Sequence, residues 1–134
     1  MKILALVLIL ADQITKYLVN LYRPDNFFLG YTENIGIAFG IPIHQGFLIV
    51  LTFALLAFLL IMGDSELNMK HKISRVSIYL IFAGGIGNLI DRMFRGFVID
   101  FVSIWKWPSF NLADVYIAAG ILLILLFHAK IKKV

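Results

Sequence analysis

The chain has 134 residues, of which 61% are hydrophobic and 15% charged, and its mean hydropathy is +0.93. An ordinary soluble domain is about half apolar and about a quarter charged, and a soluble core of this size could not bury so much apolar surface. The net charge of +4 comes from cations beside apolar blocks, so membrane topology explains it better than a nucleic-acid partner. The chain has no cysteine, which excludes disulfides, thiol nucleophiles and thiolate metal sites.

Four apolar blocks predict an all-α membrane protein with four transmembrane helices, in one integral membrane domain over residues 1–134. The blocks run at about 3–21, 46–62, 73–90 and 115–129. As a helix, each is about 22 to 28 Å long, which is enough to cross a bilayer. The first block also resembles a secretory signal peptide, but Asp12 and Lys16 interrupt it and no small-residue cleavage site follows cleanly.

Positive charges are divided unevenly between the two sides of such a four-span protein. One side has Lys2, Lys70, Lys72, Arg75, Lys130, Lys132 and Lys133, and the other has Arg23, Arg92, Arg95 and Lys106. Cationic segments are retained in the cytoplasm. We therefore expect both termini to be cytoplasmic and the loops at about 22–45 and 91–113 to face outward.

Aromatic residues are concentrated in these two outward loops. They are Tyr22, Phe27, Phe28, Tyr31, Phe39, Phe94, Phe97, Phe101, Trp105, Trp107 and Phe110. Aromatic rings favour the headgroup level of a membrane, and a belt that only anchors the protein accounts for most of them. The alternating stretch GFVIDFVSIW (96–105) also predicts a strand with one apolar face.

Asp12 and Lys16 stand four residues apart in the first block, which places them on one face of a helix. A charge near the centre of a span costs roughly 2.5 to 3.5 kcal/mol, so each needs a partner or a task. A structural ion pair is the first interpretation. A proton or ion relay in a small four-span transporter or channel subunit is the alternative, but the second block is wholly apolar and a transport path needs polar groups across the bilayer.

A polar helix face is expected at the outer end of the third block. Gly84, Asn88 and Asp91 share this face, and Gly84, Gly85 and Gly87 let a neighbouring helix come close. A packing notch with hydrogen bonds explains the pattern as well as a functional site does.

Asp100 and Asp114 have no cation close in sequence. Asp100 is embedded among apolar residues, and Asp114 follows Asn111 at the start of the fourth block. Burial and mutual repulsion raise one pKa of such a pair, so the two carboxylates can share a proton and act as acid and base. For Asp114, a helix-start residue favoured by the helix dipole is an equally good interpretation.

Five polar islands follow one another along the chain. They are DQITK (12–16), NIGIAF (34–39), GGIGNLIDR (84–92), VIDF (98–101) and FNLAD (110–114). In this order, and with the four spans, they resemble the bacterial lipoprotein signal peptidase family, signal peptidase II. The resemblance covers nearly the whole chain, whereas the GxGD pattern of presenilin-like and prepilin-like peptidases does not fit GGIGN.

The resemblance implies an aspartic endopeptidase of the bacterial cytoplasmic membrane that works at the extracytoplasmic face. Its substrates would be prolipoproteins, cut just before a cysteine that carries diacylglycerol, and membrane lipids would be its other partners. A fold of four transmembrane helices with a small extracytoplasmic β-cradle is also implied. We expect no cofactor and a monomer.

The resemblance also assigns roles to residues of this chain. Asp100 and Asp114 match the catalytic pair. The positions that line the site and hold substrate are Asn34, Asn88, Arg92 and Asn111, and the positions concerned with stability are Asp12, Lys16 and Asp91. Ile37 stands where the family commonly has a small residue. No metal site is expected, because His44, His71 and His128 are too scattered to form a ligand set.

Overall fold

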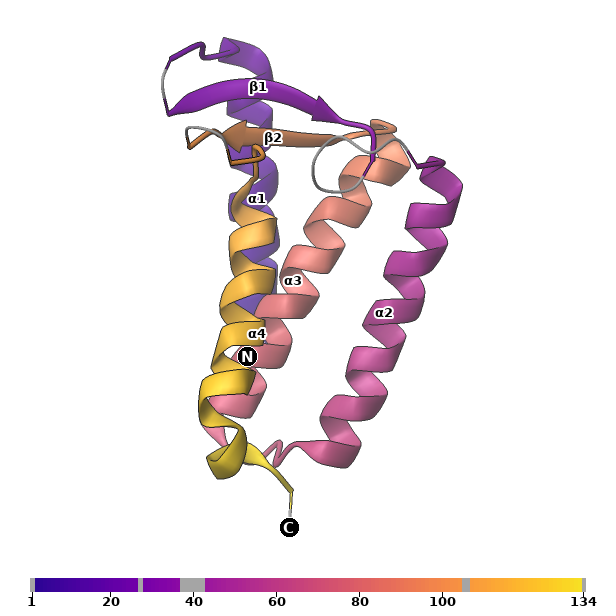
Figure 1. The fold of residues 1–134 in the computed structure, drawn as a ribbon, viewed down its shortest axis with the longest axis vertical. Coiled ribbons are helices and arrows are strands. Elements are labelled where there is room, and N and C mark those ends of the chain that lie inside the picture. Colours follow the sequence, from indigo (N-terminus) through magenta and orange to yellow (C-terminus); the bar gives the residue numbers. More distant parts are fainter. Residues whose placement is uncertain (1, 27, 37–42, 105–106, 134) are drawn as a thin grey trace.

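A short two-stranded sheet lies at one end of a bundle of four long helices, the first of which runs past it (Figure 1). The computed structural model describes residues 2–26, 28–36, 43–104 and 107–133. The elements are α1 (Lys2–Tyr22), β1 (Leu29–Asn34), α2 (Gln45–Glu66), α3 (Lys72–Phe94), β2 (Val98–Val102) and α4 (Leu112–Ile131). The sequence predictions that concern Phe27, Ile37, Phe39, Trp105 and Lys106 lie outside the described residues.

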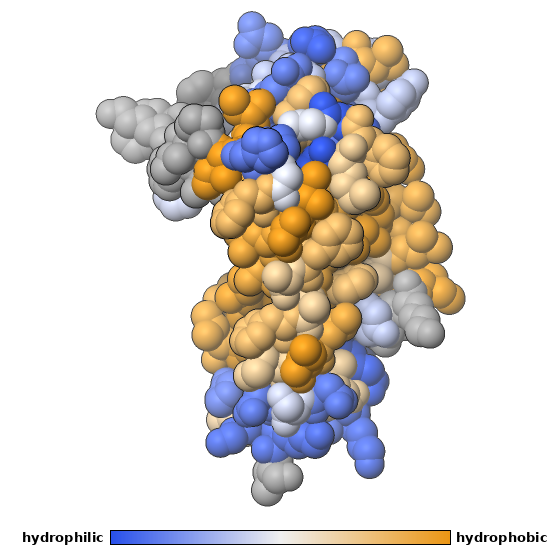
Figure 2. Space-filling view, turned by 90° about the vertical axis from the view of Figure 1, so that its right-hand side faces the viewer, coloured by the Kyte–Doolittle hydropathy of each residue, from blue (hydrophilic) through white to orange (hydrophobic). Residues whose placement is uncertain are grey.

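All four helices are long and apolar enough to cross a membrane, which confirms the predicted fold of four spans with a small sheet. The helices run past the apolar blocks because polar residues at their ends continue the helical hydrogen bonding. The α2 helix, for example, extends to Glu66 although its apolar block ends near Met62. Figure 2 shows a hydrophobic belt between hydrophilic surfaces at the two ends of the molecule. A bilayer would cover this belt.

The α3 helix is central and contacts the other three helices. Half of its apolar window is buried within the protein, compared with 17% for α2 and 11% for both α1 and α4. In Figure 1, α3 stands between α2 and the other two helices. The three outer helices therefore present most of their apolar side chains to lipid, and α3 makes the close helix contacts.

Glycines on α3 let two neighbouring helices come very close. A Cβ atom on Gly84 would lie 2.3 Å from the carbonyl oxygen of Ala113 in α4. One on Gly87 would lie 2.6 Å from a carboxylate oxygen of Asp12 in α1. The predicted close approach is confirmed. It brings Asp12 of α1 and Ala113 of α4 against the same stretch of α3.

The β1 and β2 strands pair antiparallel, with Thr32 opposite Asp100. Asn34, two residues further along the same face of β1, comes within hydrogen-bond reach of Asp100. The strand predicted within GFVIDFVSIW is confirmed, but both of its faces are buried, because Ile99 has no exposed surface and Asp100 is 2% exposed. The β2 strand contacts α1 and α3, and its edges pair with β1 and with Phe110. This enclosure explains why it does not have the single apolar face that the sequence predicted.

Backbone contacts join the segment after α2 to the end of α4 at the end of the bundle away from the sheet. Leu67 pairs with Lys132 in an isolated bridge, and the N–H of Asn68 donates to the carbonyl of Ile131 at 2.7 Å. Leu67 and Ile131 also form a buried apolar cluster with Ile78. This end is therefore held by backbone hydrogen bonds and apolar packing, whereas the sheet end is held largely by polar side-chain contacts.

We predict that Gly84→Ala destabilises the protein more than Gly85→Ala. At residue 84 the added methyl group meets a backbone atom of α4, which moves only with its helix. At residue 85 it meets only the end of the Leu56 side chain, at 2.7 Å, which can change rotamer. The first change should cost about 1 to 3 kcal/mol, as overpacking commonly does. Thermal unfolding in detergent measures the difference, and equal melting temperatures would contradict the close α3–α4 contact.

Candidate active site

Asp100 lies at the centre of β2, and its carboxylate accepts hydrogen bonds from two asparagines. Asn34 Nδ2 donates to Oδ2 at 2.9 Å, and Asn111 Nδ2 donates to Oδ1 at 2.6 Å. The pKa of Asp100 is raised to about 6, first by burial and also by the charge of Asp114, against the lowering effect of the two amide donors. Asp100 therefore keeps its proton to a higher pH than an exposed aspartate does.

Asp114 lies in the first turn of α4 and takes part in a reciprocal cap with Asn111. The N–H of Asp114 donates to Asn111 Oδ1 at 3.1 Å, and the N–H of Asn111 donates to Asp114 Oδ2 at 3.2 Å. The helix-start interpretation of Asp114 is thus confirmed. The other oxygen, Oδ1, accepts from Asn88 Nδ2 at 2.8 Å, so the same carboxylate also belongs to the polar network.

Two asparagine side chains connect the two carboxylates. Asn111 Nδ2, which donates to Asp100, also donates to Asn88 Oδ1 at 3.2 Å. The hydrogen-bond chain therefore runs from Asp100 through Asn111 and Asn88 to Asp114. The structure brings together four of the residues singled out from the sequence, although they come from α3, β2 and the start of α4. Asn34 on β1 completes the group around Asp100.

A buried ion cluster lies beneath this chain of amides. Lys16 Nζ is 2.9 Å from Asp12 Oδ2 and 3.0 Å from Asp91 Oδ2, and none of the three side chains is exposed. Arg95 forms a further ion pair with the other oxygen of Asp91. The predicted pair of Asp12 and Lys16 is confirmed, and the structure adds a second carboxylate from α3.

Both carboxylates of the ion cluster also accept backbone N–H groups next to the two aspartates of the site. Asp12 Oδ1 accepts from the N–H of Ala113 at 3.0 Å, one residue before Asp114. Asp91 Oδ2 accepts from the N–H of Ile99 at 3.2 Å, one residue before Asp100. The cluster thus holds the backbone on which each of the two carboxylates is mounted.

Among the described residues, Arg92 has no hydrogen bond to this network. Its side chain is partly buried, and its Nε atom is buried without a hydrogen-bond partner among the described residues. Its charge still interacts with those of Asp114 and Asp100. The guanidinium group therefore interacts with the charges of Asp114 and Asp100 and still has an unused N–H donor.

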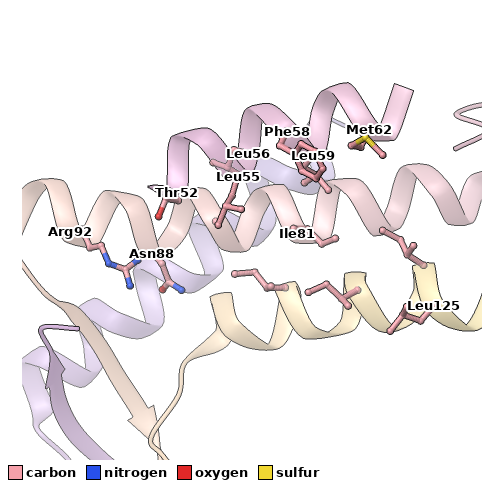
Figure 3. Close-up of a pocket in the computed structure, with 14 residues that line it drawn as sticks. Thr52, Leu55, Leu56, Phe58, Leu59, Met62, Ile81, Asn88, Arg92 and Leu125 are labelled. Carbon is pink, nitrogen blue, oxygen red and sulfur yellow. The ribbon is translucent and has the colours of Figure 1, made fainter. Parts of the chain in front are cut away.

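An apolar cavity of about 520 Å³ begins beside Arg92 and Asn88 and runs between α2, α3 and α4 (Figure 3). Apart from these two residues and Thr52, its walls are apolar. They include Leu55, Leu56, Phe58, Leu59 and Met62 of α2, Ile81 and Gly85 of α3, and Ile117, Ile121 and Leu125 of α4. The cavity can accommodate an extended apolar group whose polar end lies next to Asn88 and Arg92.

Gln13 and Arg95 are two polar residues of this region that the sequence analysis did not single out. Gln13 Nε2 donates to Asp12, to the carbonyl of Gly87 and to Asp91, at 3.1, 3.1 and 3.2 Å. Arg95 Nη1 donates to Gln13 Oε1 at 3.1 Å. The spacing of Asp91 and Arg95, four residues apart, could have indicated their ion pair. Nothing in the sequence indicates that Gln13 reaches α3.

Two of the three histidines are N-cap residues of helices. His44 Nδ1 accepts from the N–H of Gly46 at the start of α2, and His71 Nδ1 accepts from the N–H of Ile73 at the start of α3, both at 3.2 Å. Within the described ranges, no group of three or more His, Asp and Glu side chains could hold a metal ion.

The chain is similar to known proteins over nearly its whole length. The sequence model of the family described as signal peptidase (SPase) II, Peptidase_A8, matches residues 4–130. The lipoprotein signal peptidase of Borrelia garinii subsp. bavariensis is 38% identical over 148 residues, covering 94% of this chain and 87% of the relative. That of Halothermothrix orenii is 37% identical over 142 residues, covering 98% of this chain and 97% of the relative.

A solved structure has the same fold. It is described as a bacterial membrane enzyme determined by the in meso method at 2.3 Å resolution, and it is 29% identical to this chain. The TM-score is 0.82, with 96% of this chain and 86% of that chain covered. With the family match over residues 4–130, these similarities show that the chain belongs to the signal peptidase II family.

Proposed function

We propose that this chain is a bacterial membrane aspartic endopeptidase that removes signal peptides from lipid-modified prolipoproteins, with Asp100 and Asp114 as its catalytic pair. Family membership and the names of the relatives support the reaction. One observation carries the assignment of the residues: the two carboxylates are joined through Asn111, which donates to Asp100 and to Asn88, and Asn88, which donates to Asp114. Such a pair, in two different environments, supports a division into acid and base.

In the mechanism that this geometry supports, Asp100 holds the proton and Asp114 is ionised. Asp114 takes a proton from a water molecule, whose oxygen attacks the scissile carbonyl carbon, while protonated Asp100 donates a hydrogen bond to the carbonyl oxygen. The tetrahedral intermediate then collapses. The proton held by Asp114 goes to the leaving amine of the cysteine as the C–N bond breaks, and the signal peptide leaves with a new carboxyl terminus.

The remaining polar residues of the site have two different tasks in this proposal. Asn34, Asn88 and Asn111 donate to the carboxylates and hold them in place. Arg92 has an unused buried Nε, and we assign it to a carbonyl group of the bound peptide, which would accept from it. Arg92 of α3 would thus bind the peptide through a charged hydrogen-bond donor and fix its orientation in the site.

The apolar cavity supports a substrate that is itself embedded in the membrane. It begins at Asn88 and Arg92 and continues along three helices with apolar walls. We propose that it receives the apolar segment of the signal peptide or an acyl chain of the lipidated cysteine, both of which are apolar groups attached to the scissile region. Holding them there would fix the depth and direction of the scissile bond, which raises the effective concentration of the reacting groups.

The distribution of charge supports a site at the extracytoplasmic face, with both termini in the cytoplasm. The end of the bundle away from the sheet carries the cations Lys70, Lys72, Arg75, Lys130, Lys132 and Lys133. At that end the chain is folded back on itself, since Lys133 Nζ donates to the carbonyl of Asp64 at 2.9 Å. Cationic ends remain in the cytoplasm, which leaves the sheet and the two aspartates on the other side.

A transporter or channel subunit is not favoured. In the part of the chain that the structure describes, the buried charged side chains are Asp12, Lys16, Asp91 and Asp100. The first three form one ion cluster, which also holds the N–H of Ile99, the residue next to Asp100 in the sheet. A transport path needs polar groups across the whole bilayer, and the cavity is apolar over most of its length.

We predict that Asp100→Asn and Asp114→Asn each lower kcat by about 10²- to 10⁴-fold, the usual contribution of an acid or base in its correct position. The assay is cleavage of a diacylglyceryl-modified precursor by purified protein in micelles. Thermal unfolding establishes that each variant is folded. The control is Asp64→Asn, which changes an aspartate near the end of α2 that is away from the sheet. This variant should retain activity. Near-normal cleavage by either site variant would remove that aspartate from the pair.

The orientation is open to a direct labelling experiment because the chain has no cysteine of its own. A single cysteine at exposed Asp25 should react with a membrane-impermeant maleimide in intact cells. A single cysteine at exposed Lys70 should react only after the cells are lysed. The reverse pattern would place the aspartates on the cytoplasmic side.

We predict that Ile121→Trp raises KM by about tenfold, or about 1.4 kcal/mol, with kcat little changed, because it fills the cavity without touching the aspartates. Leu122→Trp is the matched control, since Leu122 is the next residue of α4 and is exposed without lining the cavity. Steady-state kinetics in mixed micelles with a constant detergent-to-substrate ratio give both parameters. The same rise in KM for both variants would exclude the cavity as a substrate site.

A further inference from the structure

We propose that Lys16 is a positioning residue for the cleavage reaction, and not only part of a structural ion pair: its ammonium group fixes the direction in which the Asn88 amide faces. Asn88 in turn directs N–H donors towards the two aspartates. This inference rests on the proposed function, since it concerns the same carboxylate pair. The ammonium does not touch the substrate or the aspartates and acts through the amide.

The surroundings of Asn88 determine the orientation of its amide. Asn88 Oδ1 accepts from Lys16 Nζ at 3.0 Å and from Asn111 Nδ2 at 3.2 Å. Asn88 Nδ2 donates to Asp114 Oδ1 at 2.8 Å. An ammonium group has three donors and no acceptor, so only the oxygen of the amide can face it. In the rotated amide, the NH₂ group would face Lys16 without an acceptor, and the oxygen would face a carboxylate.

The direction set at Asn88 extends to Asp100. Asn111 Oδ1 already accepts the N–H of Asp114 in the helix cap. Its Nδ2 group is therefore available to donate both to Asn88 Oδ1 and to Asp100 Oδ1. Each carboxylate then faces an amide donor, Asn111 Nδ2 at Asp100 and Asn88 Nδ2 at Asp114. The proton shared by the aspartates can occupy none of these positions, and it must lie on a lone pair that faces away from the amides.

The charge of Lys16 has a second effect on the site. Lys16 lowers the pKa of Asp100, in addition to the larger effects of burial, Asn34, Asp114 and Asn111. Its own side chain has no exposed surface, so solvent does not screen it strongly. Among the described residues, the charged groups that act on Asp100 are Lys16 on α1, Arg92 on α3 and Asp114 on α4.

A set of three variants separates positioning from structural support. Lys16→Met removes the cation and keeps an unbranched apolar chain. The double variant Asp12→Asn with Lys16→Met does the same in a charge-balanced cluster, because Asp91 still pairs with Arg95. Arg95→Met is the matched control. It weakens the same cluster at Asp91 but leaves Lys16 on Asn88.

We expect kcat for the lipidated precursor to fall by about 10- to 100-fold in both Lys16 variants, as misplacement of reacting groups does, with KM changed by less than about twofold. In the unaltered protein, kcat/KM should fall when Asp100 loses its proton at high pH. Loss of the Lys16 cation raises the pKa of Asp100, so this fall should shift to a higher pH. Arg95→Met should lower the melting temperature but leave kcat and this pH limit as in the unaltered protein.

Four outcomes would overturn the inference. In the first, the folded double variant has the kcat and pH limit of the unaltered protein. In the second, Arg95→Met lowers kcat as much as Lys16→Met does, which would make cluster stability the cause. In the third, neither Lys16 variant folds, which would leave Lys16 a structural role alone. In the fourth, the unaltered protein does not cleave the precursor, which would overturn the proposed function as well.

Discussion

The buried contact of Lys16 with Asp12 and Asp91 is the interaction on which the sheet end of this protein depends. All three side chains lack exposed surface. Removing one partner of such a group leaves an uncompensated charge and costs about 3 to 5 kcal/mol. Because the partners come from α1 and α3, neither helix can slide along the other without breaking an ion pair. Gly87 makes the arrangement possible, since a side chain at that position would collide with the Asp12 carboxylate.

The same carboxylates connect helix packing to the site. Asp12 holds the N–H of Ala113 and Asp91 holds the N–H of Ile99, each directly before a proposed catalytic aspartate. The two backbone segments belong to different elements, β2 and α4, yet they share one rigid support. Residues placed by such a support keep their geometry better than residues on free loops. A structural role for the cluster and a role in the placement of the site are therefore not alternatives.

The sequence predicted the parts of this arrangement that depend on local patterns. Four apolar blocks predicted the spans, alternation predicted β2, and four-residue spacing predicted the pair of Asp12 and Lys16. It could not predict that Lys16 also reaches Asp91, because that contact depends on the rotation of α1 against α3. The meeting of Asn34 with Asp100 likewise depends on the register of the two strands, which no local pattern in either segment determines. The order of the motifs indicated which residues belong together, but their hydrogen bonds depend on tertiary packing.

The sheet explains how a carboxylate on non-helical backbone can lie at a membrane boundary. Backbone groups near hydrocarbon must be satisfied within the protein, and β2 achieves this by pairing with β1 along one edge and with Phe110 on the other. The pairing encloses Asp100 deeply enough to raise its pKa to about 6. Asp114, by contrast, stands partly exposed at the N-terminus of α4, where the helix dipole favours a negative charge. Two identical side chains thus receive different environments from a strand and a helix end, and this difference supports the proposed division into acid and base.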